Sequence, residues 1–386
     1  VNDGHFWDFG DSTTSTEKDP IHIYTSPGTY KVSLYAQNSC GITNTVVKDI
    51  CIETALTPVF TLNTNNGCSP LNIETTNTTN LTESCGNETY LWEISYSSGF
   101  CGTMPEQWSF TNGTDENSKE PAFTFETAGI YTLKLTTINS CGSNTVSETI
   151  EVKQPPTNTI TSIGDFCGTA SINPAAMVDV CAPSSDTPTY NWIFPGGIPA
   201  TANTLDPGTI VYNTPGDYKI SFSVTNSCGT TADTEDFLVN PIPSITNSNL
   251  TETICSGTAS TELNLISDLA GTIFTWSASA PAGVTGFIDS ATTNTIPAQT
   301  IFNSNITAQN VTYTITPSLN GCNGPSVSLI ITIDPAPEFT SQPQDQSLCL
   351  NGSLSALTVS VNGPGTPIYQ WYLNTIDSNL GGTIIP

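Results

Sequence analysis

The stretch SPGTYKVSLYAQNSCG, residues 26–41, decides how the rest of the chain is read. Tyr30, Val32 and Leu34 share one face of an extended strand, and polar residues occupy most of the positions between them. This period of two is typical of an antiparallel strand with one buried face. Turn residues bound the strand on both sides, with Pro-Gly before it and Cys-Gly after it.

The same pattern returns twice, at residues 127–142 and 214–229. Each copy has a Gly-containing turn, a strand that begins with a tyrosine, and a second turn that reads Asn-Ser-Cys-Gly. Copies about ninety residues apart are typical of tandem β-sandwich modules rather than of one large fold. We therefore predict an all-β chain.

The charge of the chain excludes two classes of partner. Its 386 residues carry 7 Lys+Arg against 34 Asp+Glu, a formal net charge of -27, and no cation follows Lys219. Binding to nucleic acid requires clustered Lys or Arg, and docking on an anionic membrane requires the same. No apolar run is long enough to insert across a bilayer. We expect neither nucleic acid nor membrane insertion.

Twelve cysteines recur beside glycines at turn positions, and there are only two histidines. None of the cysteines forms the closely spaced pairs of a zinc site, so structural disulfides in an oxidising, extracellular setting are the better interpretation. The sequence begins and ends within a module. We expect a segment of a longer polypeptide whose export and anchoring signals lie elsewhere.

Three motifs of the first module carry a family resemblance: Trp-Asp-Phe-Gly-Asp at residues 7–11, Pro-x-His-x-Tyr at 20–24, and Pro-Gly-Thr-Tyr at 27–30. Together they resemble the PKD (polycystic kidney disease) domain, an immunoglobulin-like sandwich. Ser12 departs from the family, which usually has Gly there. The resemblance implies a packing role for His22, and nothing is assigned to His5.

The fold prediction is therefore all-β, with tandem immunoglobulin-like (PKD-type) β-sandwiches arranged end to end as an elongated rod. Short proline-bearing linkers restrict bending between them. The predicted modules, one to five, are 1–55, 56–154 (with an insert), 155–241, 242–335 (diverged) and 336–386 (immunoglobulin-like). The predicted core residues are Trp7, Trp92, Trp192, Trp276, Trp371, Tyr30, Tyr131, Tyr218 and Tyr313.

Strand order in an immunoglobulin-like sandwich leads to a set of disulfide predictions. The B–C and F–G loops share one end of the sandwich, and the A–B and C–D loops share the other. Cysteines at the same end are expected to pair. The predicted bonds within modules are Cys85–Cys141, Cys181–Cys228 and Cys68–Cys101.

Cys167 precedes strand B in module three, and Cys322 lies in the F–G turn of module four. Within one module these two ends are about 23 Å apart, whereas a disulfide tolerates about 7 Å between Cα atoms. In a head-to-tail rod, however, they meet at a joint. We predict an inter-domain Cys167–Cys322 bond, with Cys255–Cys322 as the alternative. The partners of Cys40, Cys51, Cys255 and Cys349 stay open, although Cys255 and Cys349 are expected to pair beyond these modules.

Few residues suggest chemistry, and we predict no catalytic residues. No nucleophile elbow, phosphate loop or metalloprotease helix is present. Asp3, Asp8 and Asp11 could supply oxygen ligands to Ca²⁺, but their spacing is not that of a calcium loop, and local turn bonding is favoured. Trp108 lies in the insert of module two and is the one candidate for stacking on a sugar, with packing as the alternative.

Tandem PKD modules with Cys-Gly turns and no arginine resemble the giant cell-surface adhesins of Bacteroidota, nearest to the gliding-motility adhesins of the SprB type. The resemblance implies a non-catalytic stalk outside the outer membrane, export by type IX secretion, and action with the gliding machinery. Polysaccharide or protein of the cell surface or substratum would be bound by other regions. The alternatives are an accessory region of a secreted polysaccharide-degrading or proteolytic enzyme, and glycan-binding modules.

Overall fold

The computed structural model describes residues 4–97, 101, 105–183, 185–363, 365–376 and 380–385. These residues form strands, turns and loops and contain no helix, so the chain is all-β. The chain divides into two compact units. Unit 1 is Val1–Ile163, Ser171–Val211 and Tyr218–Phe237, and unit 2 is Gly164–Ala170, Tyr212–Asp217 and Leu238–Pro386.

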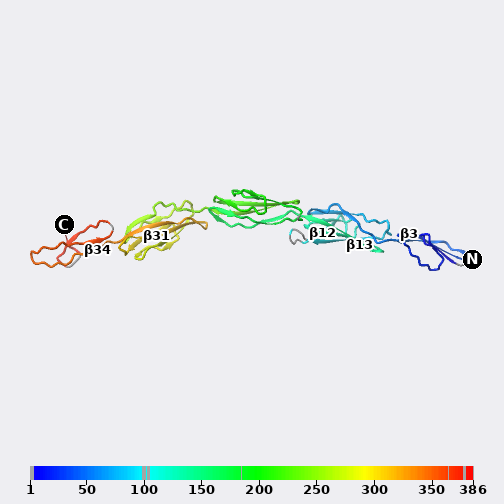
Figure 1. The fold of residues 1–386 in the computed structure, drawn as a ribbon, viewed down its shortest axis with the longest axis horizontal. Coiled ribbons are helices and arrows are strands. Elements are labelled where there is room, and N and C mark those ends of the chain that lie inside the picture. Colours follow the sequence, from blue (N-terminus) through cyan, green and yellow to red (C-terminus); the bar gives the residue numbers. More distant parts are fainter. Residues whose placement is uncertain are drawn as a thin grey trace. The chain divides into compact units, whose positions relative to one another are not determined.

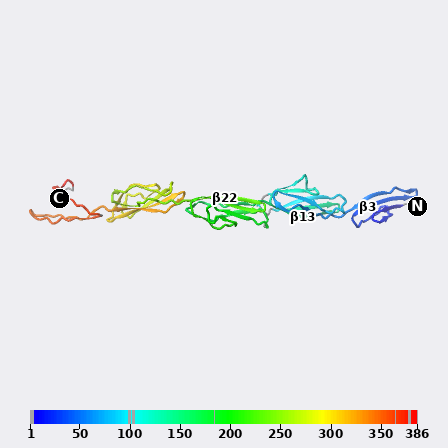
Figure 2. The ribbon, with the colours of Figure 1, turned by 90° about the horizontal axis from the view of Figure 1, so that it is seen from above.

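Module one supplies one antiparallel sheet of unit 1, with strand order β2-β1-β3-β4 and with β5 also paired to β3. The strands are β1 Gly4–Asp8, β2 Thr14–Ser15, β3 Gly28–Asn38, β4 Gly41–Ile42 and β5 Val46–Ile52. The central strand β3 (Figure 2) is the strand that the opening stretch predicts. Beside the sheet the His22 ring stacks on Phe9 at 4.1 Å, in the packing role implied by the PKD resemblance.

Module two is a sandwich of two four-stranded sheets, β10-β11-β8-β6 and β7-β13-β12-β9. The strands are β6 Phe60–Leu62, β7 Asn66–Cys68, β8 Leu71–Asn77, β9 Thr89–Ser97, β10 Trp108–Thr111, β11 Ala122–Phe125, β12 Gly129–Asn139 and β13 Gly142–Lys153. The long hairpin of β12 and β13 (Figure 1) faces β8 and β11 across a core. Trp92, Phe123 and Tyr131 are buried in that core.

Module three repeats the plan, with a long hairpin of the same strand lengths and shorter strands elsewhere. They are β14 Thr157–Ile160, β15 Phe166–Cys167, β16 Ala170–Ile172, β17 Ala176–Asp179, β18 Thr189–Ile193, β19 Thr201–Ala202, β20 Ile210–Tyr212, β21 Gly216–Asn226 and β22 Gly229–Asn240. The main sheet runs β22-β21-β18-β19 (β22 in Figure 2). Trp192 is fully buried and packs on Phe222 at 4.3 Å. The short strand β15 pairs with the end of β22 in unit 2.

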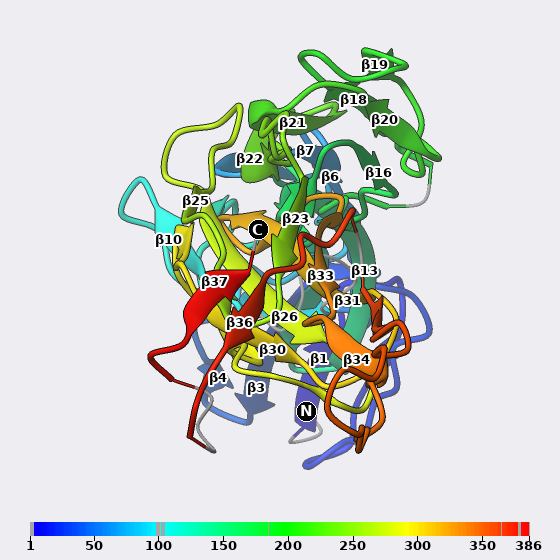
Figure 3. The ribbon, with the colours of Figure 1, turned by 90° about the vertical axis from the view of Figure 1, so that its left-hand side faces the viewer.

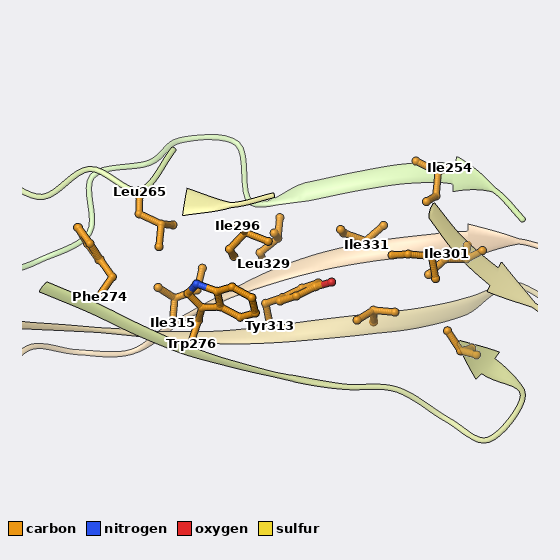
Figure 4. Packing of buried hydrophobic residues seen from close by; sticks show 13 residues of the cluster. Ile254, Leu265, Phe274, Trp276, Ile296, Ile301, Tyr313, Ile315, Leu329 and Ile331 are labelled. Carbon is orange, nitrogen blue, oxygen red and sulfur yellow. The ribbon is translucent and has the colours of Figure 1, made fainter. Parts of the chain in front are cut away.

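Module four lies wholly in unit 2, with the sheets β23-β33-β31-β26-β28, β24-β30-β27 and β25-β29. Its strands are β23 Thr251–Cys255, β24 Thr258–Ala259, β25 Leu263–Asn264, β26 Ile273–Ser279, β27 Val284–Thr285, β28 Ser290–Ala291, β29 Thr295–Ile296, β30 Thr300–Asn303, β31 Gln309–Leu319, β32 Cys322–Asn323 and β33 Val327–Asp334. Trp276 and Tyr313 meet edge to face at 5.7 Å in the middle of the core (Figure 4).

Two hairpins follow in module five (β34 in Figure 1, β36 and β37 in red in Figure 3). They are β34 Glu338–Ser341 with β35 Ser360–Asn362, and β36 Trp371–Leu373 with β37 Thr383–Ile385. Trp371 is 39% exposed, so the prediction of a core tryptophan is wrong for this residue. In the described part β36 pairs only with β37, and no opposing sheet covers the ring.

The remaining predicted core residues are Trp7, Tyr30, Tyr131 and Tyr218, and of these only Tyr131 is fully buried. Trp7 is half-buried, and Tyr218 is half-buried against Phe237 at 5.6 Å. The Tyr30 and Tyr131 hydroxyls each donate a 3.0 Å hydrogen bond to the carbonyl four residues earlier, the tyrosine corner of immunoglobulin-like sandwiches. Burial raises the pKa of Tyr131 to about 12. In these two copies the tyrosine thus closes the turn before its strand.

Candidate functional site

The four disulfides all connect neighbouring modules, and this makes the joints between modules the candidate functional site. All twelve cysteines lie in the described residues, and none of the four bonds closes within one module. We call the connections joints one–two, two–three and three–four. The bonds are Cys51–Cys85 at joint one–two, Cys68–Cys228 and Cys101–Cys181 at joint two–three, and Cys167–Cys322 at joint three–four.

Two kinds of cysteine position meet in the Cys68–Cys228 and Cys167–Cys322 bonds. The first kind immediately precedes strand B. Cys68 stands in parallel register opposite Lys153, the last residue of β13, and Cys167 stands opposite Asn240, the last residue of β22. These cysteines therefore lie where the chain leaves a module.

The second kind lies in the F–G turn of the following module, in the Asn-x-Cys or Asn-Ser-Cys-Gly sequence. Cys228 is of this kind, and its turn needs the glycine that follows. Gly229 has a φ of 150°, a backbone conformation that residues other than glycine rarely adopt. The repeated Cys-Gly pairs of the sequence are thus turn residues at a joint.

At joint two–three, Asn226 holds the turn and the linker together. Its side-chain nitrogen donates to the Gln154 carbonyl at 2.6 Å and to the Val180 carbonyl at 2.7 Å, and its side-chain oxygen accepts the Cys228 N–H at 2.8 Å. The amide is only 8% exposed. One side chain therefore orients the cysteine and binds the linker from the preceding module.

A charge pair closes the same joint. Lys153 Nζ lies 3.4 Å from Asp186 Oδ2, and the two side chains are 18% and 10% exposed. The Ser227 hydroxyl also donates to the Asp186 carboxylate. This hydrogen bond, followed by the Lys153 charge, lowers the pKa of Asp186.

Joint one–two repeats the arrangement with a different acid. The Asn139 side chain donates to the Thr54 carbonyl at 2.7 Å and accepts the Cys141 N–H at 3.1 Å. Glu53, which is 8% exposed, accepts hydrogen bonds from the Ser140 hydroxyl, from the Ser140 N–H at 3.1 Å and from the Cys85 N–H at 2.9 Å. These bonds, with the Ser140 hydroxyl first, lower the pKa of Glu53.

Joint three–four, inside unit 2, has the Cys167–Cys322 bond and a weaker polar contact. The Asn320 side chain donates to the Asn240 side-chain oxygen at 3.3 Å. Gly324 lies so close to the linker that a Cβ on it would stand 1.8 Å from the Pro243 carbonyl oxygen. Only glycine fits there without a backbone shift.

The structure corrects three of the disulfide predictions. The pairs Cys85–Cys141, Cys181–Cys228 and Cys68–Cys101 do not form. Cysteines at the same end of a module are close in the topology, but that end faces the adjacent module. The bonds therefore cross the joint.

Cys167–Cys322 is present as predicted, and the Cys255–Cys322 alternative is not, because Cys255 is a free thiol. The argument that predicts Cys167–Cys322 also applies to Cys68 and Cys228. The sequence therefore contained the signal for the joint disulfides, in the strand positions of these four residues.

One cluster has the composition of a metal site, namely Cys101, Asp179 and Cys181. Both thiols are consumed in the disulfide, which leaves one carboxylate. Asp179 Oδ1 accepts the backbone N–H groups of Cys101 at 3.2 Å and of Cys181 at 3.0 Å. The carboxylate therefore makes a local turn bond to Cys181 and a hydrogen bond across the joint to Cys101.

The proposed calcium ligands act in turns where they are described. Asp8 accepts the Gly10 N–H at 2.9 Å, and Asp11 accepts the Thr13 N–H at 3.0 Å. The second Asp11 oxygen lies 2.7 Å from His22 Nε2. Asp3 lies outside the described residues.

Trp108, the candidate for stacking on a sugar, begins β10 and packs against the core of module two. Its ring lies 5.5 Å from Phe110 and 6.4 Å from Phe123, edge to face in both cases. The residue is half-buried. This position corresponds to the packing alternative.

Two family profiles match parts of the chain. The PKD domain profile matches residues 3–52, and the PKD-like domain profile matches residues 252–337. The chain contains PKD modules. Modules one and four carry the matches, and modules two and three share the strand plan and the joint turns.

Short segments also match curated proteins. Collagenase ColQ1 of Bacillus cereus (strain Q1) is 49% identical over 37 residues, 10% of this chain and 4% of that protein. The microbial collagenase of Vibrio alginolyticus is 48% identical over 47 residues, 12% of this chain and 6% of that protein. The matches thus span a small part of either enzyme.

Solved structures with tandem sandwich domains are distantly similar. The protocadherin Gamma B2 extracellular cadherin domains 3-6 align at 9% identity and a TM-score of 0.36, covering 86% of this chain and 92% of that one. The N-terminal eight immunoglobulin domains of Down Syndrome Cell Adhesion Molecule align at 12% identity and a TM-score of 0.30, covering 99% and 50%. Among the described residues there is no helix of the length and hydropathy needed to cross a bilayer.

Proposed function

We propose that these PKD modules form a non-catalytic stalk segment that carries tension within a large secreted adhesin on the cell surface. In this proposal the stalk supports surface attachment and gliding motility, and the protein leaves the cell by type IX secretion. Regions elsewhere in the protein bind polysaccharide or protein on the cell surface or substratum. The observation that supports the proposal is the covalent path that the joint disulfides create.

That path crosses modules two and three once each. From Cys51 it passes to Cys85, follows the chain to Cys101, passes to Cys181, follows the chain back to Cys167, and passes to Cys322. The segment that crosses module two contains β9, and the segment that crosses module three contains β16 and β17. About half of the residues in these two segments therefore lie in extended strands.

The path limits how far the protein can be stretched. Between Cys51 and Cys322 the oxidised chain has about 30 residues of backbone to extend, or about 100 Å. Without the disulfides the same interval would extend to about 900 Å. The disulfides therefore reduce the maximum extension of this interval to about one ninth of that of the reduced chain, which suits an element that transmits force.

Single-molecule stretching of the purified chain tests this function. With attachment points next to Cys51 and Cys322, we expect the oxidised interval to extend to no more than about 100 Å. Reduction with dithiothreitol should restore sawtooth unfolding and increase the extension of this interval severalfold. Equal extension before and after reduction would sink the proposal.

A second candidate function has one observation in its favour. The segments similar to the collagenases are consistent with an accessory region that places a secreted enzyme on insoluble substrate. Co-sedimentation of the chain with insoluble collagen and with insoluble polysaccharides separates the two candidates. Retention of most of the protein in the pellet would favour the accessory role, and recovery in the supernatant would favour the stalk.

A further inference from the structure

Four cysteines are exposed free thiols, and they fall into the same two positions as the cysteines of the Cys68–Cys228 and Cys167–Cys322 bonds. Their positions recur about ninety residues apart, as expected of equivalent sites in tandem modules. Cys40 and Cys141 lie in F–G turns, as Cys228 does, and Cys255 precedes strand B, as Cys68 does. Cys349 follows Cys255 by 94 residues, the spacing expected of the equivalent position in module five. The free thiols are Cys40, Cys141, Cys255 and Cys349.

Cys255 has the backbone setting of a joint cysteine. β23 pairs in parallel with β33 and places Cys255 opposite Asp334, the last residue of β33. The N–H of the next residue, Ser256, donates to the Asp334 carbonyl at 2.8 Å.

The bonded cysteines repeat this setting. The N–H after Cys68 donates to the Lys153 carbonyl at 2.8 Å, and the N–H after Cys167 donates to the Asn240 carbonyl at 2.7 Å. In both cases the thiol is bonded to an F–G turn cysteine of the next module. The backbone around Cys255 therefore has the geometry that accompanies a disulfide to an F–G turn cysteine.

Cys141 has the complementary setting. Asn139 accepts its N–H, as Asn226 accepts that of Cys228. Cys141 Sγ lies 3.0 Å from the Glu53 carbonyl, one residue beyond the end of β5. At joints two–three and three–four this place beside the final strand holds a cysteine that precedes strand B.

We propose that each free thiol is one half-site of a disulfide that connects two modules in a fixed direction. Cys255 and Cys349 take a cysteine in the F–G turn of another module of this repeat type, and Cys40 and Cys141 take a cysteine that precedes strand B. Like half-sites do not pair. Each bond forms as two thiols lose two protons and two electrons, and a disulfide oxidant such as oxidised glutathione or a dithiol–disulfide oxidoreductase accepts the electrons.

The partner module belongs either to the same polypeptide or to a second copy of it. The bonds that already join these two positions have sequence separations of 160 and 155 residues. A partner in the same polypeptide should therefore lie about 155 to 160 residues from its half-site, C-terminal to Cys255 and N-terminal to Cys141. A bond between Cys255 and Cys40 would instead indicate a second copy.

Disulfide mapping of the full-length secreted protein tests the proposal. The protein is alkylated under native conditions, digested without reduction by a protease that cleaves at Asp and Glu, and analysed by mass spectrometry. We expect the Cys255 peptide to be linked to a peptide with an Asn-x-Cys turn, and the Cys141 peptide to one whose cysteine precedes a strand B. The Cys68–Cys228 and Cys167–Cys322 peptides serve as internal controls.

The variant Cys255→Ser of the full-length protein gives the matched control. It should expose one new alkylatable thiol, and that thiol should lie in an F–G turn. Alkylation of Cys255 or Cys141 in the unmodified protein overturns the proposal, and so does a bond between two cysteines of the same kind. The mapping rests on the register of the observed bonds, so its failure would leave the stretching result of the stalk proposal unaffected.

Discussion

Joints one–two and two–three use the same Asn-Ser-Cys-Gly turn but differ in the number of covalent bonds. In both, the asparagine donates to a carbonyl of the linker, at Thr54 in one and at Gln154 in the other. Joint two–three has two disulfides and a largely buried ion pair, whereas joint one–two has one disulfide and the free thiol Cys141.

The difference separates two contributions to the joint. Both joints contain the asparagine hydrogen bonds and an acid–serine bond, the hydrogen bond from Ser140 to Glu53 or from Ser227 to Asp186. These contacts therefore do not depend on the second disulfide. They place the turn cysteine beside the end of the preceding module, with or without a partner. The non-covalent contacts therefore define the joint, and the disulfides lock it.

The largest effect should come from removing the long-range bond of the two-bond joint. The loop closed by Cys68–Cys228 spans 160 residues, and the loop closed by Cys51–Cys85 spans 34. Since loop closure constrains the unfolded chain more for longer loops, Cys68→Ser with Cys228→Ser should cost about 3–5 kcal/mol of unfolding free energy. Cys51→Ser with Cys85→Ser should cost about 2–4 kcal/mol. Urea unfolding followed by tryptophan fluorescence measures both.

Cys141→Ser is the control for this prediction. Its thiol is in no disulfide, so the unfolding free energy of this variant should match that of the unmodified chain within about 0.5 kcal/mol. A smaller loss for the Cys68 and Cys228 pair than for the Cys51 and Cys85 pair would contradict the loop-length argument. It would also mean that joint two–three gains little from its second bond.

The sandwich fold could be predicted from the sequence because its signals are local. Alternation in residues 26–41 gives β3, and the repeated tyrosine gives the turn closed by its hydroxyl. Tryptophans on the central strands of modules two to four are 3%, 0% and 3% exposed. The prediction fails at Trp371, where burial depends on a second sheet that the alternation of one strand does not reveal.

The joints could be predicted only in part, because a disulfide depends on contacts between modules. Strand order places each cysteine at one end of its module, and this is correct for Cys167 and Cys322. The prediction that two cysteines at the same end of one module pair with each other fails for Cys181 and Cys228. Strand order places them at that end but does not set the direction of their side chains. The acid–serine bonds left no sequence signal, since Glu53 lies in the linker and Asp186 in a loop of module three.

Removal of the joint asparagines should have the next largest effect. Asn226→Ala leaves two carbonyls without their donor, and Asn139→Ala leaves one. Because an unsatisfied buried polar group costs about 1–3 kcal/mol, the Asn226 variant should lose more unfolding free energy than the Asn139 variant. Asn38→Ala is the matched control. Asn38 is exposed and caps the equivalent turn of module one, so the loss should be below about 0.5 kcal/mol. Equal losses in the three variants would mean that the linker bonds do not stabilise the joints.

The ion pair of joint two–three should contribute less. Lys153→Met removes the cationic partner of Asp186, while the Ser227 hydrogen bond remains. Both side chains of the ion pair are largely buried. We expect a loss of about 0.5–1.5 kcal/mol that shrinks in 1 M NaCl. Lys31→Met, which breaks the well-exposed pair with Asp49, is the control and should change stability by less than half as much. If the two variants behave alike, the ion pair adds nothing specific to this joint.

The smallest effect should be a difference in how the two joints respond to acid. Hydrogen bonds hold the pKa of Glu53 below its ordinary value of 4.5 and that of Asp186 below 3.8. A carboxylate with a lowered pKa in the folded state stabilises it above the ordinary pKa, and this stabilisation is lost as the pH falls through the folded-state pKa. Joint one–two should therefore begin to loosen first, below about pH 4.5.

Amide hydrogen exchange between pH 3 and pH 6 measures this loosening, once rates are corrected for the intrinsic pH dependence. Protection of the Cys85 and Ser140 amides, both donors to Glu53, should fall before protection at joint two–three does. Glu53→Gln should make the protection of these amides independent of pH over this range, because the group that titrates is gone. A pH-dependent loss that persists in Glu53→Gln would place the titrating group elsewhere, and the two joints would then differ only in their disulfides and in the Lys153 pair.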